Sequence, residues 1–118
     1  MLRFSPILVL LLAFAFAAPA AAQDISPDTD KTLWCASAFY WLAGSAEDSG
    51  ETSEAEMYDR WSKRLLDVAG AALRSTGYEP KKIEQIVLSY DETVLAQLGT
   101  PDAPHDIVTC PDLLGDWR

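Results

Sequence analysis

The side chains able to do nucleophilic or metal chemistry are few in this chain of 118 residues. The chain contains one histidine, His105, so a metal site with two or more imidazole ligands cannot form within one chain. Asp106 follows His105, but an acid–base pair needs a nucleophile or substrate group to act on, and the sequence indicates none. A surface or helix-capping histidine is the simpler interpretation.

Carboxylates are numerous, but their spacing does not indicate a catalytic pair. Asp91 and Glu92 adjoin in a predicted helix, so their side chains point in different directions. The spacing of the acidic stretch 44–53 does not match an EF-hand loop, which needs alternating carboxylates, a central glycine and a terminal glutamate, so the stretch is interpreted as a solvated linker. We therefore predict no catalytic residue, no metal site and no cofactor, in a protein that is not an enzyme. An enzyme of unidentified class is kept as an alternative.

The first 22 residues have the pattern of a secretory signal peptide. Arg3 makes the start positive, residues 7–18 form an apolar run, and Ala20 to Ala22 supply the small residues of a cleavage site. The run is shorter than the ~20 residues of a membrane-spanning helix. We expect cleavage after Ala22, a single domain at residues 23–118, and a periplasmic or secreted protein with no stable membrane insertion.

The two cysteines, Cys35 and Cys110, are predicted to form a disulfide. An even number of cysteines in an exported chain indicates pairing, and two cysteines allow one intramolecular bond. The alternative, a free catalytic thiol, needs a neighbouring base and a reducing compartment. A bond that closes so long a loop stabilises a small domain by roughly 4 kcal/mol in the chain-entropy estimate.

The charge of the chain restricts its partners. The formal net charge is −9, and removal of residues 1–22 takes away Arg3 alone and leaves −10. Nucleic acid and anionic membrane surfaces repel such a chain, so neither is expected as a partner. A soluble acidic exported protein is the simplest interpretation, and a basic partner is compatible with it.

Apolar residues recur at helical spacing almost throughout, which predicts an all-α fold. We expect a small up-down bundle of three main helices, at about 28–43, 54–76 and 80–98, and a C-terminal segment tethered by the disulfide. Asp28 or Asp30 is the expected cap of the first helix, and the S-x-x-E pattern from Ser53 predicts a capping box at the second.

The predicted second helix has the clearest apolar pattern and the clearest end. Five residues form its expected buried seam: Tyr58, Trp61, Leu65, Val68 and Ala72. Gly77 should end this helix in a left-handed conformation, and Tyr78 should fold back on Leu73. The short link to Pro80, at the start of the third helix, predicts that helices two and three are antiparallel neighbours. In the tail we expect a short helical turn at 104–109, because Pro111 opposes a longer helix through Cys110.

The spacing of the aromatic residues indicates a candidate partner-binding face. Trp34 and Trp41 are seven residues apart, two turns along one stripe of the predicted first helix. Surplus aromatic residues on one face are typical of protein-interaction surfaces, so Trp34, Trp41 and Trp117 are the candidate partner-binding residues. The alternative is that the tail, with Leu113 and Trp117, covers the stripe.

In composition and layout, the short, acidic, disulfide-closed helical chain is similar to the acid-stress periplasmic chaperones and to small periplasmic immunity or inhibitor proteins. We expect a non-enzymatic periplasmic protein-interaction module that binds another envelope protein. An acid-stress chaperone is the alternative that the acidic composition suggests, because its carboxylates lose charge in acid.

The predicted cleavage site is tested by the mass of the exported protein. Intact mass and N-terminal sequencing of protein isolated from the envelope or the medium should give Gln23 as the first residue. A chain that retains Met1 would contradict the signal-peptide prediction.

Overall fold

The computed structural model describes residues 25–117, apart from the side chain of Trp117. The predicted signal peptide, residues 1–22, lies outside this range. The elements are the α-helices α2 (Pro27–Asp48), α3 (Thr52–Ser75) and α4 (Pro80–Gln97), followed by the 3-10 helix η3 (Ile107–Trp117). No strand occurs in residues 25–117. The predicted all-α bundle of three main helices with a tethered tail is confirmed.

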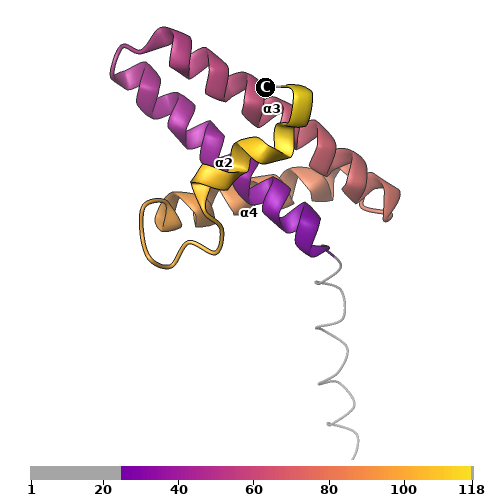
Figure 1. The fold of residues 1–118 in the computed structure, drawn as a ribbon. Coiled ribbons are helices and arrows are strands. Elements are labelled where there is room, and N and C mark those ends of the chain that lie inside the picture. Colours follow the sequence, from indigo (N-terminus) through magenta and orange to yellow (C-terminus); the bar gives the residue numbers. More distant parts are fainter. Residues whose placement is uncertain (1–24, 118) are drawn as a thin grey trace, which may run out of the picture.

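Helix α2 is the centre of the fold. It forms a hairpin with α3, while α4 and η3 pack on other sides of it, and α3 and α4 touch each other little (Figure 1). Eight consecutive residues of α2, from Thr32 to Phe39, are buried. A helix that is apolar all round must be covered all round, and three elements provide that cover.

The start of α2 differs from the prediction. Ser26 is the N-cap, and its hydroxyl accepts a hydrogen bond from the backbone N–H of Thr29 at 3.1 Å. Pro27 follows in the first turn, where its missing N–H costs nothing. Asp28 and Asp30 lie within this turn rather than capping it, close to the positive end of the helix dipole.

The end of α2 lies beyond Gly44, so the predicted boundary at residue 43 is wrong. The helix continues to Asp48 because Ala46 is buried and stabilises the added turn. It ends where Gly50 takes a φ of 79°, and the N–H groups of Gly50 and Glu51 bond back to Glu47 and Ala46. The expected linker 44–53 is therefore reduced to the short turn between α2 and α3.

The start of α3 differs from the prediction, whereas its end agrees with it. The capping box does not form, because α3 begins at Thr52 and Glu51 occupies the cap position without a side-chain hydrogen bond. The predicted C-terminal ending is confirmed. Gly77 has a φ of 99°, and the N–H of Tyr78 donates to the carbonyl of Leu73 at 3.1 Å.

The buried face of α3 is rotated from the predicted seam. Val68 is 44 % exposed, whereas Ser62 and Ala69 are buried on the same face as Leu65 and Leu73. The Ser62 hydroxyl donates to the carbonyl of Ala36 at 2.8 Å. Small side chains let the two helix backbones approach closely, and this contact sets the rotation of α3.

Helix α4 begins at Pro80 as predicted and packs mainly on α2. Helices α3 and α4, predicted to be antiparallel neighbours, do contact each other, but less extensively than either contacts α2, and they meet mainly near their connecting turn. There a small cluster of buried residues from α2 and α3 is covered by residues of α4; the buried members are Leu33, Ala69 and Leu73.

The disulfide fastens the tail to α2. Cys35 and Cys110 are bonded, both are fully buried, and their Cα atoms are 5.5 Å apart. The tail is more helical than predicted, because η3 runs from Ile107 past Pro111 to residue 117. A 3-10 segment is a succession of short turns, so the missing N–H of Pro111 removes one bond without ending it. Gly115, at φ 58°, kinks the segment.

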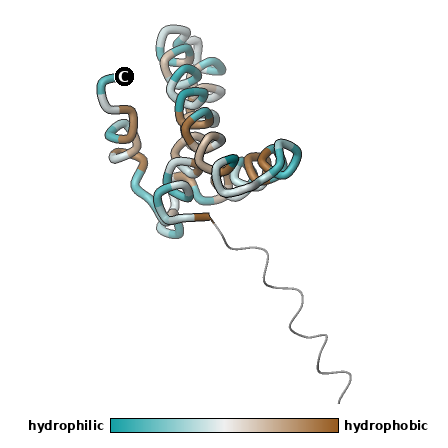
Figure 2. The backbone as a smooth tube through the Cα atoms, turned by 90° about the vertical axis from the view of Figure 1, so that its right-hand side faces the viewer, coloured by the Kyte–Doolittle hydropathy of each residue, from teal (hydrophilic) through white to brown (hydrophobic). Residues whose placement is uncertain are grey.

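Hydropathy follows this arrangement. Hydrophilic residues lie at the turns and helix ends, and hydrophobic stretches lie where the helices cross and in the C-terminal segment (Figure 2). Within the described residues, no helix is long and apolar enough to cross a membrane.

The contribution of the disulfide is tested with the double variant Cys35→Ala and Cys110→Ala. We expect its free energy of unfolding to fall by about 2–4 kcal/mol, because the unfolded chain regains the freedom that the cross-link removes. Urea unfolding measures the change. A reducing agent should lower the midpoint of the native protein and leave that of the variant unchanged; an unchanged midpoint in both would contradict the prediction.

Candidate functional site

The tryptophans predicted to bind a partner occupy different environments. Trp34 is 2 % exposed, and its indole N–H donates to Oε1 of Gln97 at 2.9 Å. It belongs to the main core and is not an exposed partner-binding residue. Trp41 is partly exposed, and its indole N–H donates to the carbonyl of Asp91 at 2.9 Å. The side chain of Trp117 lies outside the described part of the structure.

The cover over Trp34 comes from the loop that follows α4. The ring of His105 meets that of Trp34 edge-to-face, with centroids 5.6 Å apart. Trp34 and His105 line a cavity of about 480 Å³, and Ala103, Pro104 and Ile107 line it too. The tail therefore covers Trp34, as the alternative interpretation expected, although through this loop; Leu113 is 37 % exposed.

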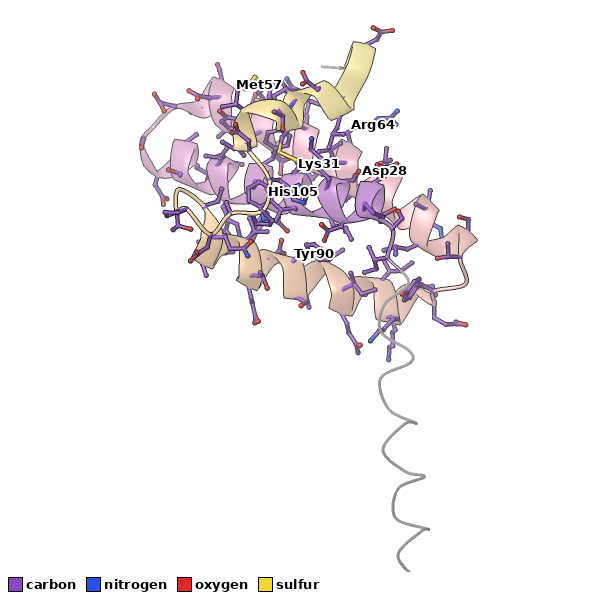
Figure 3. All side chains as sticks on the ribbon, turned by 60° about the horizontal axis from the view of Figure 1, so that its bottom comes forward. Asp28, Lys31, Met57, Arg64, Tyr90 and His105 are labelled. Carbon is purple, nitrogen blue, oxygen red and sulfur yellow. A yellow bond between two sulfur atoms is a disulfide. The ribbon has the colours of Figure 1, made fainter. Side chains whose placement is uncertain are left out.

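His105 is paired with Asp30 rather than with its sequence neighbour Asp106. Its Nε2 lies 3.0 Å from Oδ2 of Asp30, which is 75 positions away. Because a carboxylate oxygen accepts, Nε2 is the protonated ring nitrogen. The other oxygen of Asp30 accepts from the hydroxyl of Tyr90. Tyr90 and His105 both lie on the side of α2 that faces α4 and the loop (Figure 3).

Asp30, Tyr90 and His105 form the Asp30 cluster, and Asp30 and Tyr90 line a cavity of about 270 Å³. Further polar side chains from α4 line the cavity: Ser89, Thr93 and Gln97. Burial raises the pKa of the Tyr90 hydroxyl well above its usual range, and its hydrogen bond to Asp30 and the charge of that carboxylate raise it further. The cluster thus joins α2, α4 and the loop through one carboxylate.

A second opening, the acidic aromatic groove, lies between the end of α2 and the start of α3. It is about 590 Å³, and its wall includes the rings of Tyr40 and Trp41, whose centroids are 4.9 Å apart at 70°. Tyr40 is 51 % exposed. Three carboxylate-bearing residues complete the lining: Glu47, Glu56 and Asp59. The groove lies beyond the stretch of α2 that is buried on all sides, Thr32–Phe39.

The negative charge at this end of the molecule affects a neighbouring side chain. Burial raises the pKa of the Tyr58 hydroxyl, and the charges of Glu54 and Glu51 raise it further. Among the groove residues, Asp59 forms an exposed ion pair with Lys63 at 2.9 Å, which contributes little to stability. No ion pair is recorded for Glu47 or Glu56 within residues 25–117.

A metal centre is not formed by the described residues. No group of three or more His, Cys, Asp or Glu side chains is arranged to hold a metal ion there. In the same part of the chain, both cysteines are consumed by the disulfide.

Several residues of these sites were missed by sequence reasoning. Asp30 was expected only as a helix cap, and Tyr90 was not among the candidate site residues. Their meeting with His105 depends on how α4 crosses α2, and no local spacing signals that. Tyr40 was not singled out from the sequence, and it is 51 % exposed beside Trp41. The acidic residues at 47–59 are evident in the sequence, but their position beside the Tyr40 ring could not be predicted from it.

No protein-family model matches this chain, and no significant match was found among curated proteins or solved structures.

The role of Tyr90 is tested by alkaline unfolding. A group whose pKa is raised in the folded state contributes stability that is complete below its unfolded pKa, about 10 for tyrosine, and is lost as pH rises above it. The free energy of unfolding should therefore fall above about pH 10, and Tyr90→Phe should make this fall shallower. The matched control is the interval from pH 6 to 8, where the two proteins should show parallel profiles. Equal slopes above pH 10 would contradict the assignment.

Proposed function

We propose that this is an exported, non-enzymatic protein-interaction module that binds a basic segment of another envelope protein in the acidic aromatic groove. The observation that carries the proposal is a half-exposed aromatic pair bordered by three carboxylate residues in one groove. Export is part of the proposal and is supported by the signal-peptide pattern of residues 1–22 and by the paired cysteines.

The aromatic pair supports binding because part of it is held in place before a partner arrives. The hydrogen bond from Trp41 to the carbonyl of Asp91 fixes the indole ring. The ring of Tyr40 packs against that indole in a T-shaped arrangement, with an angle of 70° between the ring planes. A ring that is already ordered loses little side-chain entropy on binding. Tyrosine and tryptophan also offer a large contact area with a polar atom at one end, which suits a surface that is wet when free.

The carboxylates indicate the chemistry of the partner. Glu47, Glu56 and Asp59 line the groove, and no lysine or arginine is among its lining residues. A lysine or arginine side chain placed there would meet carboxylates and aromatic rings together, and both attract a cation. The net charge of −10 expected after cleavage would increase the rate at which a basic partner arrives. An acidic segment would be repelled.

A titration with two synthetic decapeptides tests the proposal, one of alternating lysine and alanine and one of alternating glutamate and alanine. Intrinsic tryptophan fluorescence and isothermal calorimetry measure the binding. We expect the lysine peptide to bind and the glutamate peptide not to bind. The double variant Glu47→Gln and Glu56→Gln should weaken binding of the lysine peptide by about tenfold, since two lost charges at about 0.7 kcal/mol each remove about 1.4 kcal/mol at such a surface.

The matched control is the double variant Asp67→Asn and Glu84→Gln, which removes the same charge from a different groove, between α3 and α4. It should keep most of the affinity. Equal weakening by both double variants would mean that the peptide responds to net charge alone, and would contradict a site in the acidic aromatic groove. Absence of binding to the lysine peptide would also contradict it.

A further inference from the structure

The loop at residues 98–106 is tied to the rest of the molecule by few hydrogen bonds, although Leu98 and Ala103 pack against the main core. Its recorded backbone hydrogen bonds are local, joining Leu98, Thr100 and Ala103 to residues three or four positions earlier. The hydroxyl of Thr100 likewise donates to the carbonyl of Gln97 at 2.7 Å. Beyond the loop, the chain is held by the disulfide at Cys110. The loop is therefore a strap with one end on α4 and the other near the sulfur bridge.

Between these ends, one hydrogen bond ties the strap to α2 in the described part of the chain. It is the bond between Nε2 of His105 and Oδ2 of Asp30, at 3.0 Å. The side chain of Asp30 is 45 % exposed and that of His105 is 20 % exposed, so water and protons reach the pair. A hydrogen bond to a carboxylate is about twice as strong as one between neutral groups.

The strap covers Trp34, whose ring contacts the His105 ring. Pro104 lines the cavities on both sides of Trp34, and the His105 ring packs on it edge-to-face. The indole N–H of Trp34 donates its hydrogen bond to Gln97, which lies in the last turn of α4 and outside the strap. Lifting the strap would thus expose the ring without removing its hydrogen bond.

We propose that Asp30 is a proton-operated clasp: its carboxylate holds residues 98–106 over Trp34, and protonation of that carboxylate releases the strap and exposes the Trp34 ring. Protonation changes the Asp30 carboxylate from a hydrogen-bond acceptor into a donor. A neutral carboxyl group carries a proton that it donates, and it no longer offers a negative charge to His105.

The other titratable groups around the clasp do not replace Asp30. Four titratable side chains line the two cavities: Asp30, Tyr90, His105 and Asp106. Tyr90 donates to Asp30 and stays neutral at acidic and neutral pH, because burial raises its pKa. Asp106 accepts from the backbone N–H of Val108 at 3.0 Å, within its own turn. Asp28 and Lys31 flank Asp30 on α2, and Asp102 lies on the strap; no ion pair with the clasp is recorded for these three within residues 25–117.

The experiment measures the solvent exposure of each tryptophan separately. The protein is labelled with 5-fluorotryptophan, its fluorine signals are assigned by single Trp→Phe substitutions, and a neutral soluble paramagnetic agent reports exposure. The key variant is Asp30→Asn at pH 7, which keeps the size of the side chain and removes its charge. The matched control is Asp102→Asn, which removes the same charge from the strap itself.

We expect Asp30→Asn to raise the population of the open strap by about tenfold or more, since hydrogen bonds to charged groups contribute more than neutral ones. The Trp34 signal alone should gain exposure, with helical circular dichroism unchanged, and Asp102→Asn should resemble the native protein. In the native protein, Trp34 should become exposed as pH falls, before the helices are lost. This pH response should be absent in Asp30→Asn.

His105→Gln provides a second route to the same outcome, because it breaks the clasp from the strap side and leaves Asp30 bonded to Tyr90. It too should expose Trp34 at pH 7. The proposal is overturned if Trp34 stays covered in His105→Gln and in folded Asp30→Asn. It is also overturned if the control exposes Trp34 equally, or if Trp34 is exposed in acid only together with Trp41 and Trp61 as the helices unfold.

Discussion

The disulfide between Cys35 and Cys110 is the constraint on which the arrangement of this small protein depends. It joins the middle of α2 to the start of η3, and both sulfur atoms are fully buried. Because the tail is fixed to α2 at this point, η3 and the preceding loop lie over a face that α3 and α4 leave uncovered. The stretch of α2 from Thr32 to Phe39 is then enclosed on all sides, which explains why these eight consecutive residues are buried. The helices supply most of the apolar area, but the cross-link decides where the last cover lies.

The polar groups inside this enclosure are paired, and their pairing fixes how the helices meet. Ser62 donates to the backbone of α2, Ser37 donates to the carboxylate of Asp91, and Trp34 donates to Gln97. No buried side-chain nitrogen or oxygen lacks a partner within the described residues. A buried polar group without a partner is costly, so each of these bonds disfavours a neighbouring register of α3 or α4. The contacts therefore select one packing of helices whose apolar surfaces alone would allow several.

The two ends of α2 differ in how far other elements cover them, and this difference decides which site forms at each end. At the N-terminal end, α4 and the strap enclose Trp34 and bring Asp30, Tyr90 and His105 together (Figure 3). At the C-terminal end, α2 emerges with α3 as its main neighbour, and Tyr40 and Trp41 border the acidic aromatic groove. The proposed partner site and the proposed clasp thus lie at different ends of one helix. Their tests are independent, because substitutions at Glu47 and Glu56 do not touch the Asp30 cluster.

What the sequence by itself determined was local or followed from covalent chemistry. Apolar spacing predicted three helices, Gly77 predicted the ending of α3, and the two cysteines allowed one bond. Each of these depends on residues close in sequence or on a single possible pairing. The tertiary structure decided what needs two elements at once. The rotation of α3 depends on Ser62 meeting Ala36, and the extra turn of α2 depends on the burial of Ala46. The burial of Trp34 depends on a loop about 70 residues further along the chain. The partner of His105 was decided in the same way: Asp106 is its neighbour in sequence, but the crossing of α4 and the tail over α2 gives it Asp30.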